Sequence, residues 1–387
     1  MALTKLTSNL IEGGTGTDWV TAIQTSNFTA AAGKGYFVNT TSQVLYVNLP
    51  VGVVGMEITI QDYAGTFATN KVILNANGSE KIQGSALEGE ITTNNATAVL
   101  IYQDATKGWT SQDIGLVPQN FTVDYLLVAG GGGTPAQPNT SFPGGGGAGG
   151  LRTSYGSTTG GGGSAESSLS LIPATNYTVT VGAGGTNGSN SIFSTLTSIG
   201  GGRSGSISPT VIGANGGSGG GGCGDIYSQA AGSASSPTQG YAGGSSAAGS
   251  AGANYGGGGG GGASAVGGSV GSSAQSGDGG NGLSVSITNT AVTYAGGGGG
   301  TGNTDQGTGG TGGGANGTTS GNNSGAANTG GGGAGRNLAS GGSGIVILRY
   351  PNTKTITIPG TLTATTTTVS TDKVTTFTAG TGNIQFN

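Results

Sequence analysis

Few side chains in this sequence could perform catalysis. The 387 residues include no histidine and a single cysteine, Cys223. The commonest general base is therefore missing, and an intrachain disulfide or a cysteine-based zinc site is excluded. Two carboxylates can act as the acid–base pair of a glycoside hydrolase. The candidates all lie on a predicted small β module that has too little mass to form a pocket, so we expect no enzyme: Glu57, Asp62, Glu80, Glu88 and Glu90.

Two short motifs resemble ligand-binding loops without matching them. The segment Asp278-Gly-Gly-Asn-Gly-Leu lacks the alternating acidic positions and the final bidentate Glu of a calcium loop. Gly33-Lys34-Gly35 is not a phosphate-binding loop, because no Ser or Thr follows the lysine. We therefore expect no metal and no cofactor.

Aromatic and amide side chains between the glycine runs are the candidate binding residues. If the glycine runs form a scaffold, recognition falls to the loops that connect them. Aromatic rings can stack on sugars, and amides can bond sugar hydroxyls. The alternative, favoured for any single tyrosine, is that the rings cap the ends of a glycine bundle. The predicted receptor-binding residues are Phe142, Tyr227, Tyr241, Asn254 and Tyr255.

Three arginines each follow a glycine run: Arg152, Arg203 and Arg336. They could bind acidic sugars. We favour the interpretation that they bond carbonyl groups at the ends of the runs or pair with a carboxylate. Cys223 has no cationic neighbour in sequence, so we expect an unreactive thiol.

The composition is extreme in glycine and poor in charge. Glycine accounts for 90 residues, whereas about 7% is usual, and charged residues make up 7%, against about 25% in ordinary domains. A formal charge of −4 gives no electrostatic basis for binding nucleic acid. We find neither the apolar segment of a signal peptide nor a membrane-spanning run. We therefore expect synthesis in a cytoplasm and no membrane insertion.

The chain is predicted to have three parts. Residues 1–118 are expected to form a small β sandwich or barrel, because short β-branched and aromatic segments alternate with turn residues. Val20–Ile23 could be a short helix or an arm. The strands are predicted at 36–39, 44–49, 57–60, 71–74 and 98–102.

Residues 119–350 form a glycine-rich part in which β segments separate the runs. Tyr177, Val179 and Val181 alternate with threonines, which indicates a strand with one buried face. The apolar segments 121–129 and 344–350 bracket all the runs, and we predict that they pair. Residues 351–387 are rich in threonine and are predicted to be a small β appendage or an extended arm that docks on a neighbour. The main runs lie at 130–133, 144–147, 160–163, 200–202, 219–222, 256–262, 296–300, 312–314 and 330–333.

We expect the glycines to be ordered, although a flexible linker is the usual interpretation of such sequences. The runs alternate with apolar strands and carry almost no charge, unlike disordered segments. Without Cβ atoms, extended three-residue-per-turn helices can pack closely and bond laterally. Ordering a residue costs roughly 1–2 kcal/mol and a hydrogen bond returns only about 0.5–1.5 kcal/mol, so flanking strands must clamp the helices.

Two parts of the sequence resemble proteins of tailed phages, especially marine ones. The first 118 residues resemble a tail-fibre module, and the middle region is similar to the glycine-rich domain of phage tail and adhesin proteins. The second likeness extends more loosely to tip adhesins with packed polyglycine helices. The segments that carry these likenesses include 36–41, 58–70, 98–109, 123–133, 146–152, 177–185 and 341–350.

The resemblance implies a virion structural protein, a tail fibre or tip adhesin that binds a host surface polysaccharide or outer-membrane protein. The alternative is a purely structural virion component such as a head fibre, decoration or collar protein. It also implies a homotrimer that contacts other virion proteins. These expectations come from the likeness alone.

Overall fold

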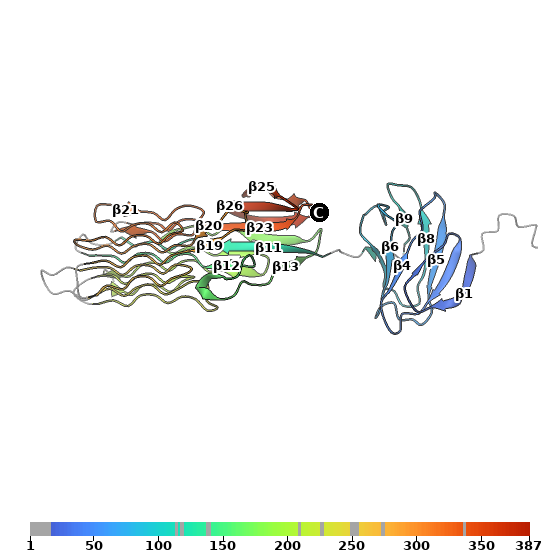
Figure 1. Ribbon diagram of the computed structural model, residues 1–387, viewed down its shortest axis with the longest axis horizontal. Helices are drawn as coiled ribbons and strands as arrows, with labels where there is room; N and C mark the ends of the chain where they lie inside the picture. The colour runs from blue at the N-terminus through green and yellow to red at the C-terminus, as the bar shows by residue number, and fades with distance from the viewer. Residues whose placement is uncertain are drawn as a thin grey trace, which may run out of the picture. The chain divides into compact units, whose positions relative to one another are not determined.

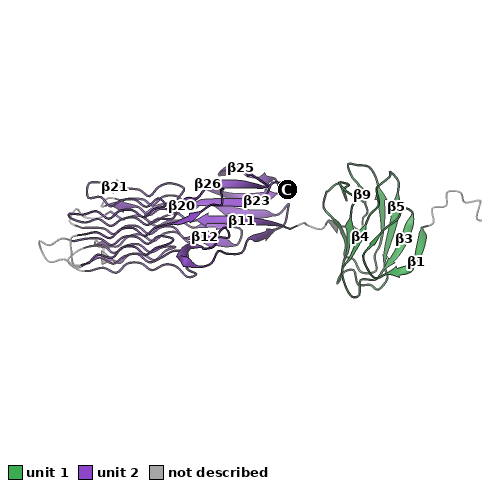
Figure 2. Cartoon of the chain, viewed as in Figure 1, with its two compact units in different colours: residues 1–119 green, residues 120–387 purple. Residues whose placement is uncertain are grey.

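The computed structural model describes residues 17–112, 115–116, 120–136, 141–207, 210–224, 228–247, 255–271, 275–335 and 338–387. The described residues form β-strands, extended segments and turns without any α-helix; a single 3₁₀ turn, η2, covers Gly160–Gly162 (Figure 1). The expected all-β class is therefore confirmed. The chain divides into two compact units, Met1–Gln119 and Asn120–Asn387 (Figure 2).

The first unit contains two five-stranded sheets between which the chain alternates. As a result β1, β3 and β5 pair in parallel in one sheet, and β2, β4 and β6 in the other. One sheet has the order β1 (Asp18–Gln24), β3 (Lys34–Val38), β5 (Glu57–Asp62), β8 (Thr97–Tyr102) and β9 (Trp109–Thr110). The other has the order β10 (Gly115–Leu116), β7 (Gly89–Ile91), β6 (Val72–Asn75), β4 (Leu45–Asn48) and β2 (Phe28–Thr29).

Side chains from both sheets share one hydrophobic core, which includes Trp109 and Phe67. In β8 the residues Ala98, Leu100 and Tyr102 are buried and alternate with exposed ones, as period-two patterning requires. Strands lie at each of the five predicted positions. The possible helix at Val20–Ile23 is wrong: these residues belong to β1, where β-branched Val20 packs against the core.

The second unit is organised by a ten-stranded sheet that curls into a nearly closed barrel. Its main path is β12 (Leu151–Thr153), β11 (Phe121–Val128), β23 (Ile345–Pro351), β26 (Asp372–Phe386), β14 (Asn176–Thr180), β15 (Ser191–Phe193) and β16 (Leu196–Ser198). Off this path, β13 (Leu169–Leu171) pairs with β11, and β24 (Ile356–Thr357) and β25 (Leu362–Val369) pair with β26. Closure is assisted by the Ser191 hydroxyl, which donates to the Val128 carbonyl over 2.8 Å.

The strands that bracket the glycine runs pair with each other, as predicted. β11 and β23 are antiparallel, with Asp124 opposite Arg349 and Val128 opposite Ile345. Residues 351–387, expected as a separate appendage, instead lie within this unit. The strand β26 runs between β23 and β14, because its buried side chains Phe377 and Ile384 complete the same core.

The central strands supply two hydrophobic clusters, one on each face of the sheet. In β11, Tyr125 and Leu127 join the first cluster, whereas Leu126 and Val128 join the second. The second cluster also includes residues next to the glycine runs, such as Ala148 and Ala263. The remaining strands form three small hairpins: β17 (Ser206–Ile207) with β18 (Thr210–Val211), β19 (Leu283–Val285) with β20 (Val292–Tyr294), and β21 (Asn322–Asn323) with β22 (Ala334–Gly335).

Candidate binding surface at one end of the glycine lattice

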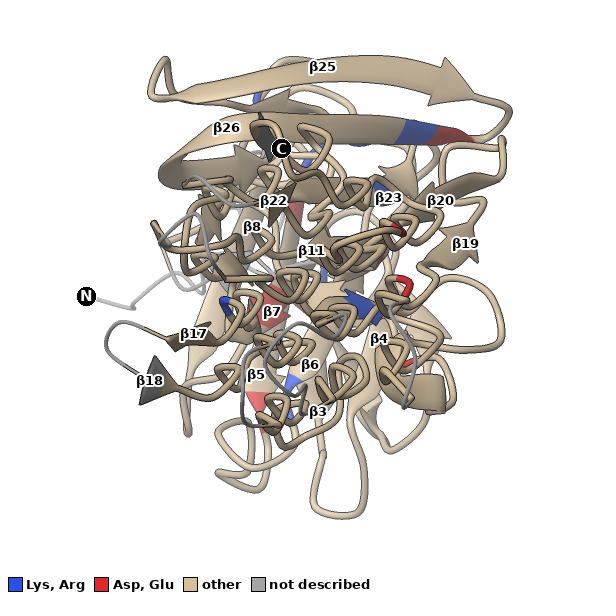
Figure 3. Cartoon of the chain, turned by 90° about the vertical axis from the view of Figure 1, so that its left-hand side faces the viewer, with Lys and Arg blue, Asp and Glu red and all other residues tan. Residues whose placement is uncertain are grey.

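The glycine runs pack side by side, and we call this assembly the glycine lattice. Seen end-on, they appear as adjacent small coils (Figure 3). In segment 145–150, successive N–H groups donate to three different neighbours, and the partner recurs every third residue. Gly145 and Ala148 donate to Gly258 and Gly261 (2.9 and 3.0 Å), Gly146 and Gly149 to Gly333 and Gly330 (2.8 and 2.9 Å), and Gly147 and Gly150 to Gly202 and Ile199 (2.8 Å each).

The carbonyls of the same part of the chain accept from three further segments, so this run has six neighbours. Gly221 and Ser218 donate to Gly145 and Ala148 (2.8 and 3.0 Å), Thr301 and Gly298 to Pro143 and Gly146 (2.9 Å each), and Gly132 and Ala129 to Gly147 and Gly150 (2.8 and 3.0 Å). The run 256–262 repeats this three-residue pattern. Its N–H groups bond in turn to segments 298–301, 219–222 and 265–268.

The close approach of these backbones explains why glycine is required. A Cβ atom placed on Gly145 would lie 1.8 Å from the carbonyl oxygen of Gly298, and one on Gly260 would lie 1.9 Å from that of Gly146. Neither contact can be relieved by turning a side chain, because the obstructing atoms are backbone. Side chains are therefore confined to the ends of the runs.

One end of the lattice meets the sheet, and the other end consists of loops. Ala148 and Ala263 mark the sheet end, since both pack in a cluster with Leu126 and Val128. At the opposite end of the same runs, Phe142 and Gly224 exchange backbone hydrogen bonds of 3.3 and 2.8 Å, and Gly256 is bridged to Gly302. Parts of four loops thus come together at the loop end, around 141–143, 224, 255–256 and 301–303.

Two of the predicted binding residues meet at this loop end. The rings of Phe142 and Tyr255 stack with their centroids 5.9 Å apart and an interplanar angle of 21°. Phe142 is buried and Tyr255 is partly exposed, so the pair presents mainly the tyrosine. Asn303 donates to the Tyr255 carbonyl over 3.3 Å, which ties a further loop to this position.

The other predicted residues are not part of that pair. Tyr241 lies at the sheet end, where its N–H donates to the Gly262 carbonyl and its hydroxyl lies close to Gly162. Its position fits the capping role that the sequence left open. Tyr227 and Asn254 lie outside the described residues.

Arg152 is held in a polar cluster at the barrel. It donates twice to Glu166, over 2.9 and 2.6 Å, and once to the Thr197 carbonyl; Tyr125 donates to the same carboxylate over 2.8 Å. Burial raises the pKa of Glu166, but hydrogen bonds from Arg152 and Tyr125 and the arginine charge outweigh burial and hold it below its ordinary value. Burial and the contact with Glu166 raise the pKa of Tyr125.

The favoured interpretation of the run-end arginines holds for the two that are described. Arg152 pairs with a carboxylate, and Arg203 donates to the Ser204 carbonyl over 3.2 Å. Arg336 lies outside the described residues. Cys223, predicted to be unreactive, is fully buried within the lattice.

The carboxylates of the first unit mostly bond the backbone. Asp62 accepts from the backbone N–H groups of Ala64, Gly65, Phe67 and Asn95. Glu80 accepts from the backbone N–H of Gly52 and from the indole N–H of Trp109. Glu90 is paired with Lys71. The carboxylates therefore stabilise turns and loops of the fold.

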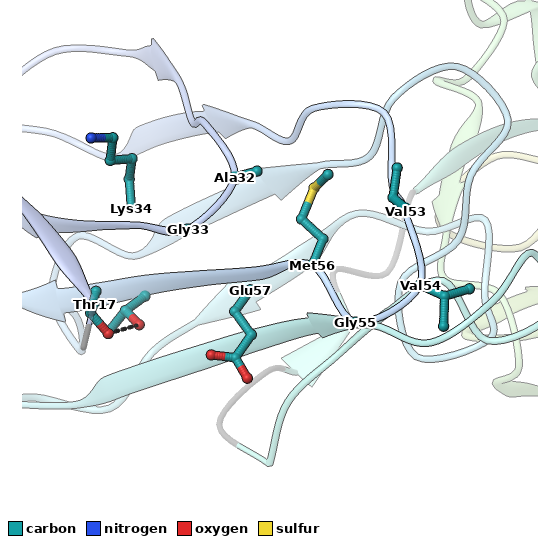
Figure 4. A pocket seen from close by; sticks show the side chains of 10 residues that line it. Thr17, Ala32, Gly33, Lys34, Val53, Val54, Gly55, Met56 and Glu57 are labelled. Carbon is teal, nitrogen blue, oxygen red and sulfur yellow. Dashed lines mark hydrogen bonds between the residues drawn. The ribbon is translucent and has the colours of Figure 1, made fainter. Parts of the chain in front are cut away.

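The sequence did not reveal a pocket of about 480 Å³ in this unit (Figure 4). Val53, Val54 and Met56 give it an aliphatic side, and Thr17, Glu57 and Thr59 a polar one. The Met56 and Glu57 side chains point to opposite sides of the backbone where β5 begins. Among the described residues that line the pocket, Glu57 is the one carboxylate.

The calcium-like segment has a structural role. Asp278 accepts from the N–H and hydroxyl of Thr308 (2.7 and 2.9 Å), and three residues later Asn281 does the same for Thr311 (3.1 Å each). These side chains therefore link neighbouring runs at the lattice period. Among the described residues, no three His, Cys, Asp or Glu side chains are grouped as a metal site.

Comparison with known families agrees with this architecture. The profile of the glycine-rich domain family matches residues 110–351, which is more than half of the chain. The chain belongs to the glycine-rich domain family. Comparison with curated proteins gives no match. Within the described parts of this family member, no helix is long and apolar enough to cross a membrane.

Proposed function

We propose that the chain is a virion structural protein of a tailed phage, a tail fibre or tip adhesin whose glycine lattice holds receptor-binding loops. The observation that carries this proposal is the convergence of four loops, with the Phe142–Tyr255 pair, at the end of the lattice away from the sheet. The likeness to phage proteins supports the assignment to a virion. The first unit would then be the tail-fibre-like β module.

We further propose that the runs are packed polyglycine-type helices. The change of bonding partner with a period of three supports this, because such a helix has three residues per turn. A run with six bonded neighbours has little freedom to bend, so the described residues at the loop end, such as Phe142 and Gly224, are held in place. Preorganised loops lose less conformational entropy when they bind a surface.

The ligand would be a cell-surface glycan or an outer-membrane protein. A partly exposed tyrosine above a buried aromatic ring offers a flat apolar contact for either. The homotrimer and the contacts with other virion proteins stay predictions from the resemblance.

A binding assay with a matched pair of tyrosine variants tests the proposal. Labelled full-length protein is incubated with a panel of bacterial strains, and bound protein is competed with purified surface polysaccharide or outer-membrane vesicles. We expect Tyr255→Ala to weaken binding roughly tenfold, equivalent to about 1.4 kcal/mol. Tyr241→Ala, at the sheet end, is the control and should leave binding unchanged.

Equal losses in both variants would contradict recognition at the loop end. If the protein binds no strain that the phage infects and does not block adsorption, the purely structural alternative is favoured instead. In that case particle assembly, rather than adsorption, should depend on the chain.

A further inference from the structure

The strand β25 forms an outer edge of the ten-stranded sheet (Figures 1 and 3). It pairs along its length with β26 and with no other strand among the described residues. Its outward backbone groups therefore offer a row of hydrogen-bond donors and acceptors. Such an edge is a template for pairing with another strand.

This edge lacks most of the features that usually prevent pairing. Proteins protect edges with short strands, charged residues, proline or bulges. β25 has eight residues, Leu-Thr-Ala-Thr-Thr-Thr-Thr-Val, with neither charge nor proline. Its single register shift lies near one end, between Thr363 and Ala364. Other edge strands of the unit are shorter: β12, β13 and β16 have three residues each.

The side chains of β25 are suited to an identical partner. Thr363 and Thr365–Thr368 are exposed, and threonine pairs across antiparallel strands are favourable. Two charged residues lie next to this edge, Asp372 and Lys373. Both belong to β26, just after the turn that joins it to β25. Because Asp372 bonds Arg349 and Lys373 donates to the Lys354 carbonyl, these charged groups are already engaged within the chain.

We propose that β25 pairs antiparallel with β25 of a second copy of this chain and joins two sheets across a two-fold axis. An antiparallel pair of identical strands is self-complementary, so it closes after two copies. The pairing does not rest on the proposed receptor contact, because β25 belongs to the sheet and not to the loop end of the lattice. A single strand pair buries a small interface, so the association should depend on concentration.

The test uses the full-length protein and two oppositely charged variants. Thr365 and Thr367 lie on the same face of β25, so Thr365→Lys with Thr367→Lys places two positive charges on the edge; the second variant carries Glu at both positions. Sedimentation equilibrium across a hundredfold concentration range measures the mass. We expect the unmodified chain to approach twice the monomer mass, each charged variant to stay monomeric, and an equimolar mixture of the two to regain the pair.

The matched control carries Ser284→Lys and Ser286→Lys, which are exposed and equally spaced but lie at the β19 hairpin. It should associate like the unmodified chain. A monomer at every concentration overturns the proposal. So does a trimer, which is the assembly that the likeness to phage proteins implies. Association that both charged variants retain, or that their mixture does not restore, overturns it as well. Thermal unfolding of each variant separates loss of pairing from loss of folding.

Discussion

Replacing one glycine inside the lattice by alanine should be far more damaging than the same change at its edge. Gly145 is the critical position, since its Cβ would lie 1.8 Å from the Gly298 oxygen and 2.3 Å from the carbonyl carbon. Gly271 is the control, because a Cβ there has no atom of the described residues within 4 Å and its φ lies outside the left-handed region. The two substitutions are chemically identical, so their difference isolates the close packing of the runs.

The cost at Gly145 follows from the hydrogen bonds that must break. Real Cβ atoms essentially never approach other atoms within 3.0 Å, so the two backbones must part by at least the difference between 1.8 and 3.0 Å. That displacement breaks the lateral bonds of Gly145 to Gly258 and Gly221, and those that join Gly146 to Gly298 and Gly333. Four bonds at about 0.5–1.5 kcal/mol each give a loss of roughly 2–6 kcal/mol. Gly271→Ala should be neutral or stabilise by about 0.4–1 kcal/mol, because alanine restricts the unfolded chain.

Two measurements check this prediction. Calorimetry of the full chain should show a lower transition temperature for the second unit, while the first unit, with its own core, keeps its transition. The single thiol supplies the second measurement: Cys223 is buried in the lattice, so its reaction with a thiol reagent reports opening. If Gly145→Ala and Gly271→Ala unfold within about 0.5 kcal/mol of each other and react equally fast, the close-packing argument is wrong.

Three further predictions concern side chains that stabilise the two units. Asp62→Asn should destabilise the first unit by about 2–3 kcal/mol, because an amide nitrogen would face backbone N–H groups that the carboxylate now accepts; an unchanged denaturant midpoint would exclude this role. Leu127→Ala should cost the second unit roughly 2–5 kcal/mol, because it leaves a cavity in the core of the sheet, and should accelerate thiol reaction of Cys223, because its neighbours Leu126 and Val128 pack against the lattice; slow reaction despite the lost stability would show that the lattice does not depend on β11. The pKa of Glu166 is lower in the folded chain than its ordinary 4.5, so its contribution is present above about pH 4.5 and is lost as the pH falls through the folded pKa. Denaturant titrations from pH 7 to 3 should therefore show a shallower acid decline for Glu166→Gln, and equal slopes would refute it.

The sequence predicted the strands well, because their signals are local. Alternation in Tyr177, Val179 and their neighbours sets one buried face without reference to the rest of the chain. The pairing of β11 with β23 was also predictable, since these apolar segments bracket the glycine runs. That bracketing does not indicate where the later threonine-rich strands join the sheet. The position of β26 between β23 and β14 could therefore not be predicted.

The candidate site was only partly predictable for a related reason. Phe142 and Tyr255 are more than a hundred residues apart in sequence, and only the route of each run decides that they meet. The same route places Tyr241 at the opposite end, although its sequence surroundings resemble those of Tyr255. The bidentate ion pair between Arg152 and Glu166 could not be predicted either, because no helical or strand periodicity relates these two positions in the sequence.

The glycines of the lattice do not by themselves determine the register in which neighbouring runs align. In ordinary sheets the register is set by side chains, and a slip of one residue exchanges the buried and exposed faces. A glycine run has no side chains, and a slip of three residues would restore the same pattern of lateral bonds. The register must therefore be set by residues at the ends of the runs and by the few side chains that link one run to another.

Alanines at the sheet end supply part of this information. Ala148, Ala263 and Ala295 each adjoin a long run and pack in the cluster with Val128, so a slipped run would drive a Cβ into the lattice or leave a gap in the cluster. The ladder of Asp278 with Thr308 and Asn281 with Thr311 fixes two adjacent runs in the same way. The three alanines lie at the sheet end, so the loops at the other end can change without disturbing the contacts that they make. A scaffold whose register is set largely by side chains at one end leaves its opposite end freer to vary in sequence.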